Sequence, residues 1–341
     1  MATWGIELTR DGPGLLLRDI ASRDDPQVAA ALDVIGESAA DILFLTRIDT
    51  DRGGLTLTAL ADALAAIGAP YPYRFTWTTN TGLPSDADLN GDGRLGTPGD
   101  AQGWGRFRGH GAMALLSRFP LNLETGRDFS NLLWADLPET RVHGDGRVHL
   151  LDADALKVQR LSTVGHWMVD VRLPNEARLT LMMYAATPPV FDGPEDRNGR
   201  RGADETALWR HVLDGKLGPA PRPPFVLLGR ANIDPVDGEG RHGAIRDLLN
   251  DPRLQDPAPA SAGGRAAADE SHGGDPATDT AEWRSAALGG PGNLRVDYVL
   301  PSADLTVRDA GVVWPEGPAE RERRASRHRL VWVDIALPFG D

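Results

Sequence analysis

Short runs of apolar and β-branched residues recur along the chain and alternate with polar stretches. Such runs, when they are bounded by Gly, Pro, Asn or Asp, are typical of strands that are buried on both faces. We therefore predict strands over residues 41–46, 111–117, 179–185, 225–229, 294–300 and 330–335.

Apolar residues spaced three or four positions apart predict amphipathic helices between these runs. One helix should begin after Asp25, because an acidic N-cap there precedes a proline at a first-turn position. A second should end at Gly68. The four predicted helices carry their apolar faces within residues 28–35, 57–67, 204–213 and 243–249.

Strands outnumber helices, and their spacing lacks the regular alternation of a βαβ protein. This pattern predicts an α+β sandwich in which helices lie outside two sheets. Two segments, about 84–108 and about 256–293, are poor in apolar residues, and we expect both to be long loops. Strand-like segments continue on both sides of each loop, so we expect residues 1–341 to form a single domain.

The formal net charge of −13 narrows the choice of partners. A chain of this charge is repelled by DNA, RNA and anionic lipid unless basic residues are concentrated locally. We therefore expect no nucleic-acid partner and no membrane, whereas a small anionic ligand in a local pocket is compatible with the charge. The absence of cysteine excludes disulfides, thiolate zinc sites and a cysteine nucleophile.

The first residues, Met1 to Glu7, lack the basic region followed by an apolar core that marks a secretory signal. No apolar run approaches the roughly 20 residues that a membrane-spanning helix needs. This pattern predicts a soluble, cytoplasmic protein.

Several segments, in a fixed order along the chain, carry a resemblance to a known family. The most specific is Thr187-Pro-Pro-Val-Phe-Asp-Gly-Pro-Glu-Asp-Arg-Asn-Gly199, and shorter ones cover residues 7–14, 80–82, 88–94, 293–302 and 328–332. Together they resemble the endonuclease/exonuclease/phosphatase superfamily of metal-dependent phosphoesterases, from about residue 3 to residue 336. The resemblance implies a four-layer αββα sandwich, the DNase I-like fold, with an active site at one edge of the two sheets.

The resemblance also implies a particular chemistry. Members of the family hydrolyse phosphoesters with one or two hard divalent cations, usually Mg²⁺, which require oxygen ligands. The cation neutralises charge on the phosphoryl oxygens and lowers the pKa of an attacking water. A histidine that is oriented by an aspartate assists in proton transfer.

Most positions that hold these groups in the family carry other residues here. Gly5 replaces the asparagine that ends the first strand, and Arg47 replaces the glutamate that follows the second. Ala185 stands where the family has the histidine that precedes the Pro-Pro segment. Neither glycine nor alanine offers a group that could bind a metal or transfer a proton.

The two motifs nearest the C-terminus are half retained. In the Gly-Asp-x-Asn motif, Arg230 replaces the aspartate and only Asn232 is kept. In the Ser-Asp-His motif, Arg327 replaces the aspartate and His328 is kept. Because three carboxylates have become arginines, the resemblance implies that no divalent cation binds at the family's magnesium site.

Two main explanations fit these substitutions. In the first, the site has been repurposed as a clamp for phosphate or carboxylate. Its ligand-binding residues would be Arg47, Arg230, Asn232, Arg327 and His328. In the second, the site has drifted and its arginines pair with acids that remain nearby, namely Asp49, Asp234 and Asp297. Deliberate engineering is a third explanation, although an engineer would more often choose alanine.

The function that follows is that of a pseudoenzyme, which keeps the phosphoesterase fold, has lost the metal reaction and binds a phosphorylated or otherwise anionic small molecule. Two alternatives stay open. One is an active metal-dependent phosphodiesterase or phosphatase with a shifted site. The other is a structural or partner-binding protein with a closed pocket.

Residues 88–94 also resemble the start of a calcium-binding loop. Asp88, Asn90 and Asp92 place oxygen ligands at alternate positions, and Gly93 suits the sharp turn around the ion. The closing acid is out of register, because Gly99 stands at the twelfth position. The alternative interpretation is a polar turn of Gly and Asp.

Three further features have simpler interpretations. We interpret His166 and Trp167 as a half-buried structural pair, and Trp283 as core or rim packing. The arginine-rich run over residues 316–329 also contains glutamates, which is typical of a solvated loop. Because this run leads into the expected pocket, it could also gate or steer an anionic ligand.

Overall fold

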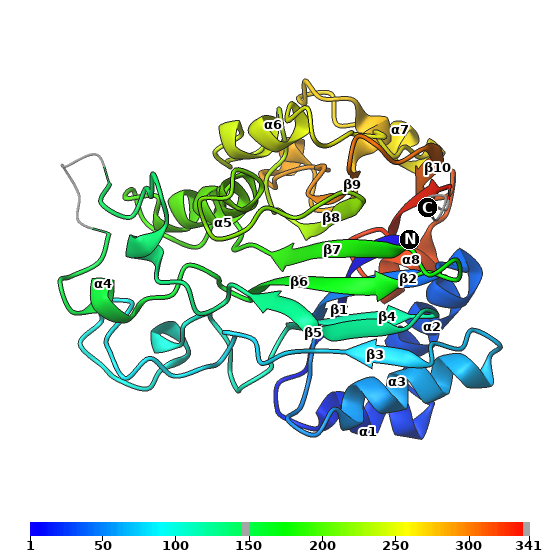
Figure 1. Cartoon of the computed structure of the whole chain (residues 1–341), viewed down its shortest axis with the longest axis horizontal. Coiled ribbons are helices and arrows are strands. Elements are labelled where there is room, and N and C mark those ends of the chain that lie inside the picture. Colours follow the sequence, from blue (N-terminus) through cyan, green and yellow to red (C-terminus); the bar gives the residue numbers. More distant parts are fainter. Residues whose placement is uncertain (145–149, 337–341) are drawn as a thin grey trace.

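Two β-sheets form the centre of the molecule in the computed structural model, which describes residues 1–144 and 150–336 (Figure 1). The first sheet consists, in spatial order, of β10 (Val307–Val312), β11 (Val331–Ile335), β1 (Ala2–Leu8), β2 (Ile42–Ile48), β4 (Ala112–Ser117) and β3 (Tyr73–Phe75). The second consists of β5 (Leu121–Asp128), β6 (Gly165–Arg172), β7 (Arg178–Ala185), β8 (Phe225–Arg230) and β9 (Asp297–Pro301).

Helices cover the outer face of each sheet, as Figure 1 shows with α5 and α6 on one side and α1 to α3 on the other. The first sheet packs against α1 (Leu15–Ser22), α2 (Pro26–Ser38), α3 (Leu55–Ala66) and α8 (Glu320–Ala325). The second packs against α5 (Arg197–Leu213), α6 (Gly243–Leu249) and the short α4 (Ala155–Val158). The structure therefore has the predicted α+β, four-layer αββα arrangement.

A third apolar cluster fills the space between the sheets. Phe44 and Met113 of the first sheet meet Met183, Leu228 and Val299 of the second in this cluster. Side chains alternate between the two faces of a strand. A residue at a strand end that stands two or four positions from a member of this inner cluster therefore lies on the same, inward face of its strand.

The structure contains the six predicted strands and the four predicted helices. The side chain of Asp25 caps α2 by accepting a hydrogen bond from the Val28 amide at 2.8 Å. Two boundaries differ from the prediction by three positions or more: β9 begins at Asp297, and α5 begins earlier, at Arg197. Helix α5 buries Arg201, Asp204 and Glu205, and these polar residues conceal its apolar periodicity.

The two long loops carry short helical turns. Residues 84–108 contain the 3₁₀ helix η1 (Pro98–Asp100), and residues 256–293 contain α7 (Ala262–Ala266), η3 (Pro276–Thr278) and η4 (Ala286–Leu288). A further 3₁₀ helix, η2 (Trp134–Asp136), precedes α4. Among the described helices, none combines the length and the apolar character needed to cross a membrane.

Candidate anion-binding site at the strand ends

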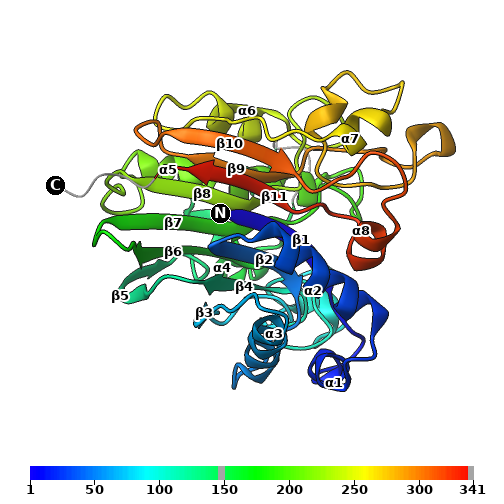
Figure 2. The same cartoon turned by 90° about the vertical axis from the view of Figure 1, so that its right-hand side faces the viewer.

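The register of the strands gathers the predicted site residues at one end of the sandwich. In the second sheet, Arg230 at the end of β8 is paired with Ala185 on β7 and with Asp297 on β9. In the first sheet, Gly5 on β1 is paired with Thr46 on β2. Strand β1 packs across the interior against β8 and β9, so these ends face one another (Figure 2).

Arg230 is a deeply buried cation of this region. Its exposed fraction is only 5%, and it makes no ion pair within the part of the chain that the structure describes; its Nε atom has no hydrogen-bond partner. Burial is the largest influence on the guanidinium and, with the positive charge of Arg47, lowers its pKa to about 10. Arg230 therefore stays charged at neutral pH, and its Nε–H group is free to donate a hydrogen bond.

Arg47 occupies a bulge at the end of β2. The register of β2 shifts between Thr46 and Ile48, and Arg47 has a positive φ of 56°. Its Nε atom lies 3.9 Å from Oε1 of Glu7, which is an ion-pair distance without a hydrogen bond. The bulge re-aims this side chain away from the outer helices, where neighbouring β2 residues pack.

Glu7 is the site residue that the sequence interpretation missed. Its carboxylate accepts hydrogen bonds from Arg327, at 2.7 Å from Nη2 and 2.9 Å from the backbone amide. Burial opposes ionisation of Glu7, but the Arg327 hydrogen bonds and the nearby charges outweigh it and lower the pKa to about 2. The signal was its place two residues after Gly5 on a strand that lines the site.

His328 is held by a carboxylate and by the backbone. Its Nδ1 lies 2.7 Å from Oδ2 of Asp297, and its carbonyl accepts a hydrogen bond from Nε1 of Trp4 at 3.0 Å. The ring lies against Gly5: a Cβ atom added at Gly5 would stand 2.8 Å from Cγ of His328. The asparagine of the family pattern would therefore collide with this ring.

Asn232 and Ala185 carry no charge, and their contacts are structural. The Asn232 amide donates to the carbonyl of Ala186 at 2.6 Å, so this side chain ties the end of β8 to the loop after β7. Ala185 is fully buried and belongs to the apolar cluster between the sheets. Where the family pattern has a histidine, the inner wall of the site is thus apolar.

The explanation by drift named Asp49, Asp234 and Asp297 as partners of the arginines, but among the described residues none of the three pairs with Arg47, Arg230 or Arg327. Asp49 accepts from the backbone amides of Arg10 and Gly111, and Asp234 accepts from backbone amides that include that of Arg295. Asp297 instead pairs with His328. The arginines of the site pair with Glu7 alone among the described acids, and Arg230 pairs with none.

Buried polar atoms without partners gather at these strand ends. They are Thr46 Oγ1, Arg47 Nε, Arg230 Nε and Asp297 Oδ1. Most buried polar atoms in proteins have a hydrogen-bond partner, so each exception asks for an explanation. Two of the four are guanidinium donors, which an anion could satisfy.

The donor set does not fit the divalent cation that the family uses. No group of three or more His, Asp or Glu side chains is placed to hold a metal within residues 1–144 and 150–336. The carboxylates that do line the site, Glu7 and Asp297, already bind Arg327 and His328. Magnesium requires near-octahedral oxygen ligands, whereas Arg47, Arg230 and Arg327 offer only nitrogen donors.

A cavity of about 420 Å³ adjoins the strand ends. It is lined by Glu282, Trp283, Arg284, Pro291, Arg323 and Arg327. Arg327 belongs both to this cavity and to the ion pair with Glu7, and the Trp283 ring contacts the His328 ring at 5.4 Å between centroids. The cavity is therefore an outer compartment of the same site.

The residues of the predicted calcium loop form a self-contained turn. Asp88 accepts from the amides of Gly91 and Gly93 at 2.7 and 2.8 Å, and Asp92 accepts from the Arg94 amide at 2.8 Å. The Asn90 amide donates to Asp92 at 3.2 Å. These bonds account for the turn without an ion, and calcium binding at this loop stays a prediction.

His166 and Trp167 are not half-buried, as predicted, but fully buried. His166 bonds Ser162 Oγ at 2.6 Å and the Glu205 carbonyl at 2.8 Å through its two ring nitrogens. Burial lowers the pKa of His166 to about 3, so this imidazole is neutral at physiological pH. Its role is to connect a loop to α5.

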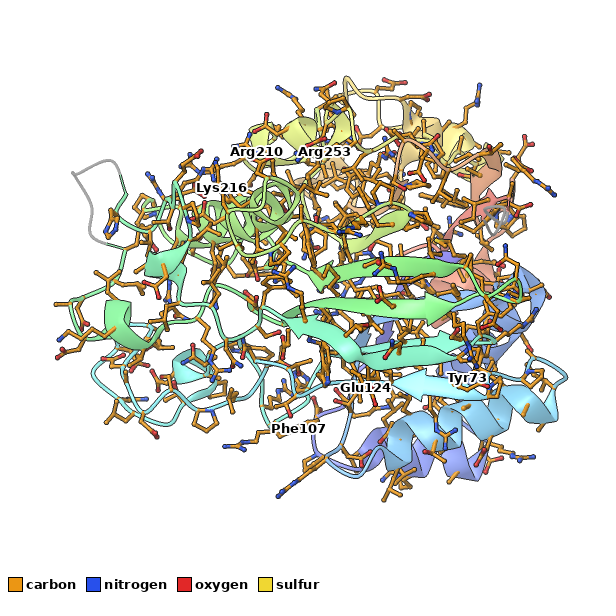
Figure 3. All side chains as sticks on the ribbon, in the orientation of Figure 1. Tyr73, Phe107, Glu124, Arg210, Lys216 and Arg253 are labelled. Atoms are coloured by element: carbon orange, nitrogen blue, oxygen red, sulfur yellow. The ribbon has the colours of Figure 1, made fainter. Side chains whose placement is uncertain are left out.

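A second basic cluster lies on the outer surface, over α5 and α6, where Figure 3 labels Arg210, Lys216 and Arg253. Unlike Arg230, each of these cations has a carboxylate partner. Arg210 binds Asp247 at 2.9 Å, Lys216 binds Glu139 at 2.8 Å, and Arg253 binds Asp251 at 2.6 Å. This cluster therefore has no free charge for a ligand and serves below as a source of control variants.

The fold and the site together define a DNase I-like sandwich whose strand-end site is built around arginines. The sequence matches the Endonuclease/Exonuclease/phosphatase family over residues 14–328. The chain belongs to this family, and the resemblance that its sequence carries is confirmed.

Solved structures of the same family share the fold. The structure is similar to an endonuclease/exonuclease/phosphatase from Beutenbergia cavernae DSM 12333 (TM-score 0.56, 20% identity, 98% of this chain and 70% of that chain). It is also similar to a family protein from Leptotrichia buccalis C-1013-b (TM-score 0.53, 11% identity, 99% of this chain and 100% of that chain). A third similar structure is the family protein from Bacteroides vulgatus (TM-score 0.52, 11% identity, 99% of this chain and 98% of that chain). At these identities the likeness concerns the fold. A sequence comparison with curated proteins found no match.

Proposed function

We propose that this protein is a pseudoenzyme of the family, which has lost the metal-dependent phosphoesterase reaction and binds a phosphorylated or otherwise anionic small molecule at the strand ends. The observation that carries the proposal is Arg230, a buried guanidinium with no ion pair among the described residues and an unpartnered Nε. The charge of Arg47 also acts on Arg230, and Arg327, which pairs with Glu7, is a further donor.

The energetics of burial support an anionic ligand. A charged group removed from water destabilises the folded state unless it is paired. The charges of Asp297, Glu7 and Glu205 act on Arg230 from a distance, but none of these carboxylates forms an ion pair with it among the described residues. Phosphate carries oxygen acceptors that match guanidinium in charge and geometry, so its binding would compensate Arg230.

The donor set argues against the family's hydrolytic reaction. The positions that hold metal-binding carboxylates in the family pattern carry Arg47, Arg230 and Arg327. Two of these guanidiniums would repel a divalent cation from close range, and the third neutralises Glu7. We therefore expect binding without turnover of phosphoesters.

One observation favours the alternative of a residual hydrolase. His328 keeps a hydrogen bond to Asp297, an arrangement suited to proton transfer. Release of p-nitrophenol from bis(p-nitrophenyl) phosphate, abolished by EDTA or by His328→Ala, would establish that alternative and overturn the pseudoenzyme. A third candidate, a structural protein whose pocket is closed by the Glu7–Arg327 pair, requires that no anion binds at all.

The proposal is tested by titrating the wild type and Arg230→Gln with inorganic phosphate in a calorimeter. We expect the wild type to bind and the variant to lose at least about tenfold in affinity, because a charged hydrogen bond contributes about 1.5–3 kcal/mol. Arg210→Gln removes an arginine from the outer cluster and should leave the affinity unchanged. Equal affinities of wild type and Arg230→Gln, or no binding by the wild type, would contradict the proposal.

A further inference from the structure

The outer cavity has a fixed aromatic wall. Trp283 follows a segment that pairs with the C-terminal part of the chain: Ala281 is bridged to His328, and the Glu282 amide donates to the Arg327 carbonyl at 2.9 Å. The ring is half-buried and meets the His328 ring nearly edge to face, with an interplanar angle of 83°. Its backbone and one ring edge are therefore positioned before any ligand arrives.

The cavity also carries an excess of positive charge. Arg284, Arg323 and Arg327 line it, whereas Glu282 is its one carboxylate. That carboxylate is already bound by Arg323, at 3.0 Å from Nε to each oxygen, and by the buried Arg329. Arg284 is exposed and makes no ion pair with any described residue, so the cavity favours an anionic occupant.

The size and lining of the cavity suit an organic ligand better than a bare ion. A volume of about 420 Å³ falls within the roughly 300–1,000 Å³ of small-molecule sites. Trp283 and Pro291 supply apolar surface, and the lining arginines supply charge. An aromatic ring can stack on tryptophan, and arginine can contact the face of the same ring.

From these observations we infer that the ligand is an aromatic phosphate ester, with its planar ring in the cavity against Trp283 and its phosphate next to Arg327 and the strand-end arginines. The inference rests on the proposed function for the phosphate and adds the chemical class of the rest of the ligand. Arg327 joins the two compartments, because it lines the cavity and also binds Glu7.

The experiment compares two probes, inorganic phosphate and phenyl phosphate, by calorimetry. The wild type should bind phenyl phosphate more tightly than inorganic phosphate. Trp283→Ala should weaken phenyl phosphate binding by about fivefold or more and leave inorganic phosphate binding unchanged, since aromatic pairing contributes about 0.5–1.5 kcal/mol beyond its buried area. Trp283→Phe, which retains a ring, should keep most of the affinity.

Matched controls separate this inference from the proposed function. Trp104 is 55% exposed and does not line the cavity. The control variant Trp104→Ala should therefore bind both probes as the wild type does. Equal affinity of the wild type for both probes, or an equal loss for both in Trp283→Ala, would overturn the aromatic class while leaving phosphate binding intact. Failure of the wild type to bind either probe would overturn the proposed function and this inference together.

Discussion

At the scale of single residues, the site is shaped as much by a missing side chain as by its charges. Gly5 allows the His328 ring to lie directly against β1, because any Cβ at this position would come within 2.8 Å of the ring. The ring cannot easily move away, since Asp297 holds its Nδ1 and Trp4 holds its carbonyl. A larger residue at position 5 therefore requires the His328 ring to shift.

We expect Gly5→Ala to lower the free energy of unfolding by about 1–3 kcal/mol, because overpacking a buried site forces neighbouring groups to shift. Urea denaturation measures the change. Gly12→Ala is the matched control, since the nearest atom to its Cβ would be Cδ1 of Leu15 at 3.5 Å, an ordinary contact. A Gly5→Ala protein as stable as the Gly12→Ala protein would contradict the packing described here.

The ionisation of Glu7 should make the free energy of unfolding depend on pH. Its folded pKa is depressed to about 2 from an ordinary value of 4.5, so its contribution is fully present above about pH 4.5 and disappears as the pH falls towards 2. The depression corresponds to about 3 kcal/mol. Denaturant titrations between pH 6 and pH 2 should show a shallower loss of stability in Glu7→Gln than in the wild type, and parallel pH profiles would refute this role.

At the scale of elements, helix α5 links the second sheet to the loops beneath it through buried polar groups. Asp204 accepts from Trp134 Nε1 at 2.7 Å and from the amide and guanidinium of Arg141 at 2.7 and 2.6 Å. Glu205 accepts from the Thr187 amide at 2.7 Å, directly after the strand that ends at Ala185. The loops on this side of the site are therefore anchored by one helix.

Loss of the Asp204 carboxylate should be among the most damaging changes in the protein. Asp204→Ala leaves the Trp134 indole N–H and the Arg141 guanidinium without a partner, and we expect a loss of about 3–5 kcal/mol. Thermal and urea unfolding measure it. Asp33→Ala, on the exposed side of α2, should change stability by no more than about 0.5 kcal/mol. A loss no larger than that of Asp33→Ala would show that the network is not coupled to folding.

The elements that could be predicted from the sequence are those whose periodicity is unbroken. The predicted runs ending at Thr46, Ala185 and Gly229 are continuous and mainly apolar, and each forms a central strand. Strand β5 was missed because its residues are largely exposed and charged, as suits an edge strand. The family pattern located Arg47, Arg230 and Arg327, but pairing of Glu7 with Arg327 joins residues 320 positions apart and depends on folding.

At the scale of the whole molecule, the local positive site stands within a strongly acidic chain. The net charge is −13, whereas the strand ends and the cavity gather arginines. Long-range repulsion by the acidic chain should slow the approach of an anion, and salt should screen that repulsion beyond about 8–10 Å. Salt should also weaken the attraction of an anion to the exposed Arg284 and Arg323 more than its attraction to the buried Arg230. Selectivity for the ligand would then depend on the burial of Arg230.

The placement of β1 between β11 and β2 has a consequence for how the protein folds. One edge of β1 pairs with the nearby β2, whereas the other edge pairs with β11, where Val331 lies far along the chain, as the adjacency in Figure 2 indicates. Contacts of such high sequence separation are slow to form and leave an open edge exposed to aggregation and to chaperones. Because Glu7 and Arg327 meet only when this gap closes, ligand binding would report that both edges of β1 have been paired.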